Sequence, residues 1–133
     1  MKYWIFVLAL APAIVHGGPS DYQCTVKQEL APSYVLQGLG PGTGELRPVP
    51  QSSFVGERFA VDRATGRVIG SLFDTGGADE IKVIHPGSDN MAFKVIAIGQ
   101  GKIKVLVIRE NTVHPEKEFY GMFHPVVLAG TCK

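Results

Sequence analysis

The sequence has little cysteine, little net charge and no apolar run long enough to cross a membrane. A structural zinc site usually takes four ligands from Cys and His, and only two cysteines, Cys24 and Cys132, are available. Thirteen basic residues against twelve acidic ones leave a formal net charge of +1. Because such a chain lacks a strong long-range field, we expect it to bind neither nucleic acid nor an anionic membrane surface.

The N-terminus has the pattern of a secretory signal peptide. Lys2 is followed by thirteen apolar residues, Tyr3 to Val15, fewer than the roughly 20 of a transmembrane helix. Val15-His16-Gly17 then offers a cleavage site. We expect residues 1–17 to be a signal peptide and residues 18–133 to form one secreted or periplasmic β domain, with no stable membrane anchoring after cleavage. Loss of Lys2 leaves 13 − 1 = 12 basic against 12 acidic residues.

The two cysteines lie near the two ends of the expected mature chain. In an exported protein an isolated pair favours a disulfide over two free thiols. We therefore expect a Cys24–Cys132 bond, which would stabilise the fold by roughly 4–5 kcal/mol in the chain-entropy account. Since the bond needs Cα atoms within about 7 Å, the first and last strands should be neighbours.

Period-two alternation and tight turns predict strands, and no segment shows a convincing helical period. Residues 32–53 hold four Pro and four Gly in 22 residues and are expected to form a loop. Six to eight short strands favour an all-β fold, an antiparallel β-sandwich or small barrel with one disulfide. The expected strands are 24–30, 57–62, 67–72, 80–84, 91–98, 102–109, 119–123 and 126–132.

Two hairpins are predicted with a register. The turn 63–66 ends in Gly66, which can adopt the left-handed conformation, and it places Val61 opposite Val68. A three-residue turn at 99–101 places Ile98 opposite Lys102 in the longer hairpin. One face of that hairpin then reads as core: Met91, Phe93, Val95, Ala97, Ile103, Val105 and Val107.

The other face of the long hairpin is the candidate binding face. It mixes lysines with large aliphatic side chains, whereas a solvated sheet face should be mostly polar. Either another segment covers it, with 32–53 the natural candidate, or it is an exposed interaction patch; we favour the cover. The candidate residues are Lys94, Ile96, Ile98, Lys102, Lys104 and Leu106.

Histidine chemistry is the next alternative. His85, His114 and His124 each precede a proline, which pushes them into extended geometry at strand ends or in loops. They could meet at one zinc ion with Asp89, Glu116 or Glu118, but their spacing is not that of a short-range ligand motif. We expect no metal and no cofactor.

Nucleophilic catalysis is weakly indicated. Ser71, Ser88 or Thr131 could meet a His and an Asp in the fold, because triads are defined by geometry. The chain has no nucleophile elbow and no glycine-rich oxyanion loop between a strand and a helix. We therefore assign no catalytic residue.

Several motifs resemble a known group of proteins. Val61-Asp62-Arg63-x-Thr65-Gly66, Asn90-x-x-Phe93-Lys94-Val95 and the terminal Gly130-Thr131-Cys132 are similar to those of small exported bacterial β-rich proteins of unknown function. The resemblance covers residues 57–133. It implies export, an all-β fold and the disulfide, and it supplies no catalytic residue.

Together these observations favour a binding protein over an enzyme. We expect a protein-binding or inhibitor-like module whose partner is another exported protein. One alternative is a carrier of a small apolar ligand inside a β-barrel, and a less favoured one is a hydrolase.

Overall fold

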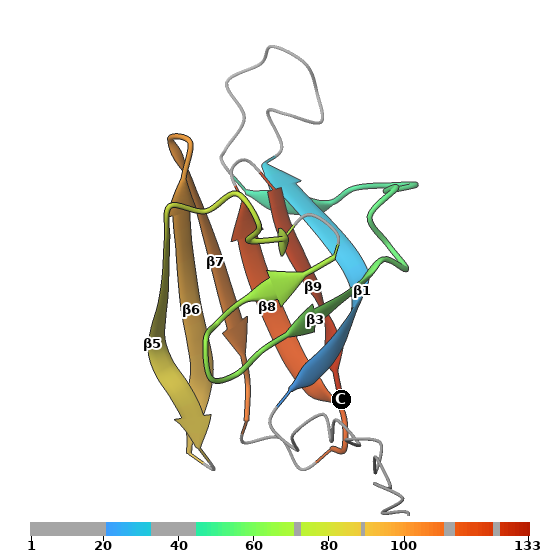
Figure 1. Ribbon diagram of the computed structural model, residues 1–133. Coiled ribbons are helices and arrows are strands. Elements are labelled where there is room, and N and C mark those ends of the chain that lie inside the picture. The colour runs from blue at the N-terminus through green and yellow to red at the C-terminus, as the bar shows by residue number, and fades with distance from the viewer. Residues whose placement is uncertain (1–20, 33–44, 71–72, 89, 111–113, 124–125) are drawn as a thin grey trace, which may run out of the picture.

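The computed structural model describes residues 21–32, 45–70, 73–88, 90–110, 114–123 and 126–133. These residues form nine antiparallel strands and no α-helix, in one sheet that curls into a half-barrel (Figure 1). The expected all-β class is confirmed, whereas the expected signal peptide lies outside the described residues. The strands are β1 (Tyr22–Pro32), β2 (Leu46–Pro48), β3 (Arg58–Val61), β4 (Val68–Ile69), β5 (Glu80–Ser88), β6 (Met91–Gly99), β7 (Lys102–Ile108), β8 (Lys117–Phe123) and β9 (Val126–Cys132).

The strand order is β4-β3-β1-β9-β8-β7-β6-β5, with β2 pairing the far end of β1. The first long strand and the last strand are therefore adjacent, as expected. Cys24 lies directly opposite Cys132 in this pairing, and the two form a disulfide with Cα atoms 4.0 Å apart. The predicted disulfide is confirmed.

Part of the segment expected to be a loop is a strand. Within 32–53, β2 pairs the end of β1 from Leu30 opposite Pro48 to Pro32 opposite Leu46. The pairing satisfies backbone groups of β1 that β3 does not reach, because the first residue of β3, Arg58, lies opposite Thr25. Residues 33–44 lie outside the described part of the chain.

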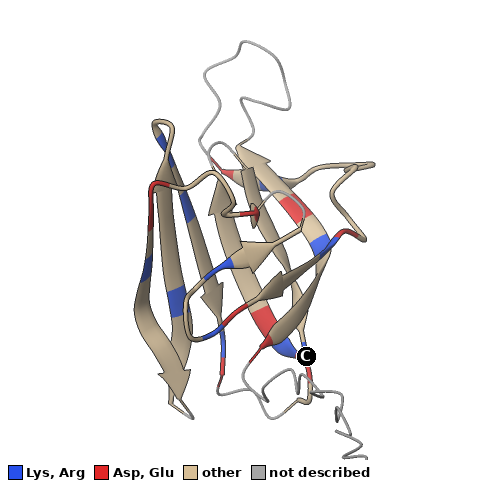
Figure 2. Ribbon diagram, in the orientation of Figure 1, with Lys and Arg blue, Asp and Glu red and all other residues tan. Residues whose placement is uncertain are grey.

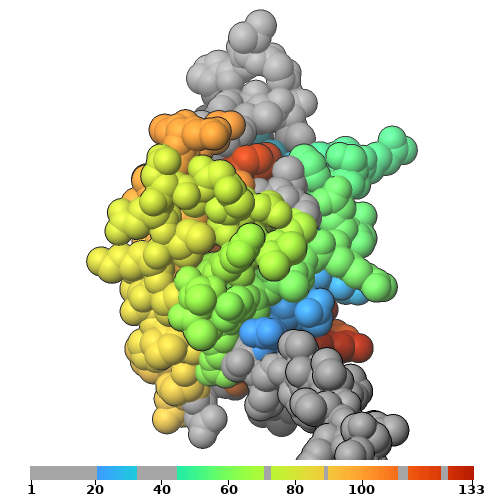
Figure 3. Space-filling view, viewed as in Figure 1, coloured from blue at the N-terminus to red at the C-terminus, as the bar shows by residue number. Residues whose placement is uncertain are grey.

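The β3–β4 hairpin has the register that the sequence predicts, with Val61 opposite Val68. Gly66 has φ +75°, and a Cβ there would lie 2.6 Å from a methyl group of Val95. The turn thus packs closely onto the concave side of β5 and β6. In Figure 3 the chain from β3 to the start of β5 lies across the front of the molecule.

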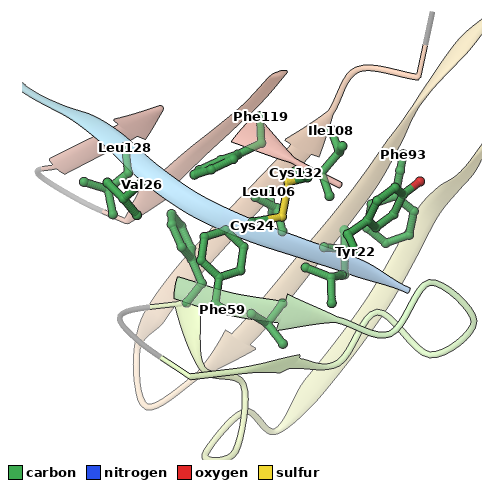
Figure 4. Close-up of a cluster of buried hydrophobic side chains, with 14 residues drawn as sticks. Tyr22, Cys24, Val26, Phe59, Phe93, Leu106, Ile108, Phe119, Leu128 and Cys132 are labelled. Atoms are coloured by element: carbon green, nitrogen blue, oxygen red, sulfur yellow. A yellow bond between two sulfur atoms is a disulfide. The ribbon is translucent and has the colours of Figure 1, made fainter. Parts of the chain in front are cut away.

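An aromatic cluster fills the space between this hairpin and the sheet. The Phe59 ring centroid lies 5.3 Å from that of Phe73 and 5.0 Å from that of Phe119, within the range of favourable ring pairs. The Cys24–Cys132 disulfide lies in the same layer (Figure 4). Side chains from β1, β3, β6, β7, β8 and β9 therefore share one core.

The register predicted for the β6–β7 hairpin is wrong by one residue. Ile98 lies opposite Ile103, and Gly99 opposite Lys102, so the turn has two residues rather than three. Gln100 and Gly101 have φ of +52° and +71°, as in the type I′ turn that matches the twist of paired strands. Since side chains alternate along a strand, the shift exchanges the two faces of β7.

Strand β5 does not end before His85 as expected but continues to Ser88, past a bulge between Val83 and His85. The strand can include Pro86 because it lies at the edge of the sheet, where a missing N–H removes no ladder bond on the open side. The His85-Pro86 pair is therefore part of the sheet and does not terminate a strand.

The register can be tested with one substitution on each face of β7. Leu106 is 2% exposed and Ile103 is 56% exposed. Leu106→Asp should lower the free energy of unfolding by about 3–5 kcal/mol, because it buries a carboxylate and removes core packing. Ile103→Asp should cost about 1 kcal/mol or less. Urea denaturation measures both losses. A larger loss for Ile103→Asp than for Leu106→Asp would contradict the two-residue turn and support the three-residue turn instead.

The disulfide can be tested by its removal. Intact-mass measurement of the native protein should give a value below that of the reduced protein by the mass of two hydrogens. The Cys24→Ser, Cys132→Ser variant should lose about 2–5 kcal/mol of stability, because the unfolded chain regains the freedom of a loop with a sequence separation of 108. Two thiols that titrate fully in the native protein would contradict the bond.

Candidate interaction surface

The residues of the predicted binding face lie on two faces of the sheet. Lys94, Ile96 and Ile98 of β6 point outward, away from the core, as expected. Because β7 is turned over, Leu106 lies in the core and Lys104 projects toward the same inner side. Lys102 lies beside the turn, opposite Gly99, and is exposed.

The outward face instead carries an apolar patch that spans four strands. In register order, Ile96 lies opposite Val105, Val105 opposite Met122, and Met122 opposite Val127. Ile98 and Ile103 form a further apolar pair beside the turn. We call this set the apolar outer patch; its members are Ile96, Ile98, Ile103, Val105, Met122 and Val127.

The apolar outer patch is open to solvent. Ile98, Ile103 and Met122 are 41%, 56% and 51% exposed, and the other three are half-buried. Most of the segment expected to cover this face, residues 33–44, lies outside the described part of the chain, and the described residues leave these large side chains accessible. Monomeric proteins rarely expose contiguous apolar surface of this kind unless something binds there.

Charged residues of β5 and β6 border the patch. Lys82 lies opposite Ile96, Lys94 opposite Val107, and Glu80 opposite Ile98. Within the described residues neither lysine forms an ion pair. Figure 2 shows basic and acidic residues distributed over the strands on the visible side. The excess of lysines at the border of the patch is therefore a local feature and does not reflect the charge of the whole molecule.

A cavity of about 150 Å³, lined by both polar and apolar residues, opens at the β6–β7 turn. The Lys104 ammonium donates to the Asp74 carbonyl at 2.8 Å and lies 5.9 Å from the centre of the Phe123 ring. Backbone N–H groups of Gly70 and Gly76 donate to the Asp74 carboxylate and lower its pKa. Lys104 thus joins the 73–79 segment to β7 and is already engaged.

A buried carboxylate cluster lies at the opposite end of the half-barrel. The Glu110 side chain is 6% exposed; it accepts from the Tyr22 hydroxyl and forms ion pairs with Arg63, at 3.1 Å, and with Lys117. The Arg63 Nε also donates to the Pro86 carbonyl at 2.7 Å. The cluster therefore joins the β3–β4 turn to β5, β1 and β8. It was not predicted, because no local spacing connects these residues.

The histidines do not form a metal site in the described structure. His85 lies in β5, where its Nδ1 accepts a hydrogen bond from the Gly87 N–H at 3.0 Å, and His114 is exposed. His124, Asp89 and Ser71 lie outside the described residues. Among the residues that are described, no three of His, Cys, Asp and Glu gather as metal ligands would.

The Glu110 cluster can be tested against an exposed ion pair. Glu110→Gln should cost about 2–4 kcal/mol of stability, because it leaves Arg63 and Lys117 beside a neutral amide in a buried setting. Glu118→Gln is the matched control: its pair with Arg109 is about half exposed, so the change should cost about 0.5 kcal/mol or less. Equal losses in thermal or urea unfolding would contradict the structural role.

Comparison with protein-family models, with curated proteins and with solved structures finds no match to this chain. Its function is therefore argued from the surfaces of the sheet. Within the described residues no helix has the length and apolar character to span a membrane.

Proposed function

We propose that this chain is an exported binding protein that docks another exported protein through the apolar outer patch. The observation that carries the proposal is the exposure of Ile98, Ile103 and Met122 on three adjacent strands. Aliphatic and methionine side chains are suited to the centre of such an interface, where water is excluded. The disulfide supports export, because such bonds persist in oxidising compartments.

The border of the patch favours a partner with an acidic rim. Two lysines without ion-pair partners in the described structure, Lys82 and Lys94, outnumber the one carboxylate, Glu80, along the same edge. Rim charges contribute mainly to the association rate and to the choice of partner. We therefore expect an apolar partner surface bordered by Asp or Glu.

The filled interior supports docking over the transport of an apolar ligand. The apolar cavity between Val68, Phe73, Val95 and Leu106 holds about 10 Å³. Even a benzene-sized guest needs about 150 Å³ of apolar space. The rings of Phe59, Phe73 and Phe119 fill the region that a barrel ligand would use.

The proposal predicts that patch variants lose the partner while keeping the fold. Wild-type protein, immobilised and exposed to the exported proteins of its source cells, should retain a partner identifiable by mass spectrometry. Ile103→Asp and Met122→Asp should each reduce its retention at least tenfold, since a charge is placed in a desolvated interface. Both variants should melt close to the wild type.

Arg47→Glu is the control, because Arg47 is exposed on β2, outside the patch, and should leave retention unchanged. Undiminished retention by both well-folded patch variants would overturn the docking proposal. So would an equal loss in the Arg47→Glu control.

A further inference from the structure

A groove separate from the apolar outer patch runs over β1 and β9 on the outward face of the sheet. One hollow of about 480 Å³ lies between Gln23, Thr25, Arg58 and Lys133. A second, of about 260 Å³, lies between Gln28, Glu118, Tyr120 and Ala129. Lys27 and Thr131 line both hollows, which therefore adjoin. Their volumes are of the order found in small-molecule sites, about 300–1,000 Å³.

The groove follows from the lengths of side chains that share the outward face. In one cross-strand row, Thr25 of β1 and Thr131 of β9 lie between Arg58 of β3 and Glu118 of β8. In the next row, Ala129 lies between Gln28 and Tyr120. Short side chains thus form a floor along β1 and β9, and long ones form the walls on both sides.

The carboxylates that line the two hollows are both paired with cations. Glu116 pairs with Lys133 at 3.5 Å, and Glu118 pairs with Arg109 at 3.0 Å. Lys27 and Arg58 form no ion pair within the described residues. The groove therefore combines two available cations with the threonine hydroxyls of its floor. Because the chain as a whole has a formal charge of only +1, any attraction for anions comes from this local arrangement.

Tyr120 adds an aromatic surface at the end of the groove. Its side chain is 46% exposed, although it lies between the half-buried Val107 and Ala129 on the outward face. An exposed tyrosine ring offers a flat apolar surface with a polar tip. A sugar ring, whose C–H groups form an apolar face edged by hydroxyls, matches both parts.

We propose that this groove binds an acidic oligosaccharide, a linear chain of sugars that carry carboxylates. Lys27 and Arg58 pair with the carboxylates, Thr25 and Thr131 hydrogen-bond the ring hydroxyls, and Tyr120 stacks on one sugar. Charge-assisted bonds to carboxylates are among the stronger polar contacts available at a surface. The site needs no contribution from the apolar outer patch, so it stands independently of the proposed docking function.

The position of the groove favours a sugar over an acidic peptide. Extended peptides are commonly recognised by main-chain hydrogen bonds at a free sheet edge. Here the floor strands are central: β1 and β9 pair each other, and β3 and β8 flank them. Apart from the bulge at Lys27, their backbone groups are used in the sheet, so recognition falls to side chains, which suits a ligand whose polar groups are hydroxyls and carboxylates.

The floor is also held in place before any ligand arrives. Thr25 and Thr131 are the chain neighbours of Cys24 and Cys132, whose disulfide joins the two floor strands from the core side (Figure 4). A rigid floor reduces the ordering that binding requires.

The test is calorimetric titration of the full exported protein with an oligogalacturonate, an oligomer of galacturonic acid. Its methyl ester serves as the neutral control and poly-glutamate as the acidic-peptide control. We expect the oligogalacturonate to bind and the other two to bind at least about tenfold more weakly. Lys27→Glu and Arg58→Glu should each lower the affinity about tenfold or more, since each replaces a charge-assisted contact by a repulsive one. Tyr120→Ala should lower it about fivefold.

Lys94→Glu makes the same change of charge on the outward face but outside the groove, and it should leave the affinity within twofold of wild type. Thermal melts check that every variant is folded. The absence of oligogalacturonate binding, equal binding of poly-glutamate, or an equal loss in Lys94→Glu would each overturn the proposal. Because Ile103→Asp should not change sugar binding, this site and the docking surface succeed or fail separately.

Discussion

The structure depends on the pairing of β1 with β9. The other neighbouring pairs in the sheet join residues at most 61 − 22 = 39 apart in sequence, as in Tyr22 opposite Val61, whereas this one joins segments separated by 108 residues at the disulfide. It connects the five-strand meander β5–β9 to the group formed by β1, β2, β3 and β4. Closing so long a loop carries the largest loop-closure entropy of any strand pairing in the sheet, and the disulfide offsets much of that cost by constraining the unfolded chain. The core shared by Val26, Phe59, Phe119 and Leu128 exists only when this junction is made.

Features that depend on a few neighbouring residues, or on a pairing with no alternative, could be predicted from the sequence. The Asp62–Gly66 turn fixes its own register, since the Asp62 carboxylate accepts from Thr65 and the Ala64 N–H, which also lowers its pKa. The disulfide was readable because only one pairing of two cysteines exists. The β6–β7 register was not, because Gly99-Gln100-Gly101 is compatible with two turn lengths and Gln100 is an unusual residue for positive φ. That one residue decided whether Leu106 or Ile103 would be buried.

Features that depend on contacts between distant segments of the chain could not be predicted from the sequence. Glu110 gathers Tyr22, Arg63 and Lys117 from three other parts of the chain, and nothing in the spacing of these residues connects them. The groove likewise depends on which short and long side chains face one another across β3, β1, β9 and β8. The outward face of the long hairpin was predicted only in part for the same reason: Lys94, Ile96 and Ile98 share it because they alternate along one strand, and their neighbours on β7 depended on the pairing.

The edges of the sheet have a consequence for self-association. At one edge β4 has only two residues, and at the other β5 is interrupted by a bulge and by Pro86, whose carbonyl is bonded to Arg63. Such edges are poor templates for the addition of strands from another molecule. If the β1–β9 junction opened, β1 with eleven residues and β9 with seven would instead present long unpaired edges. Because the disulfide holds this junction closed, it disfavours the exposure of those edges as well as stabilising the fold.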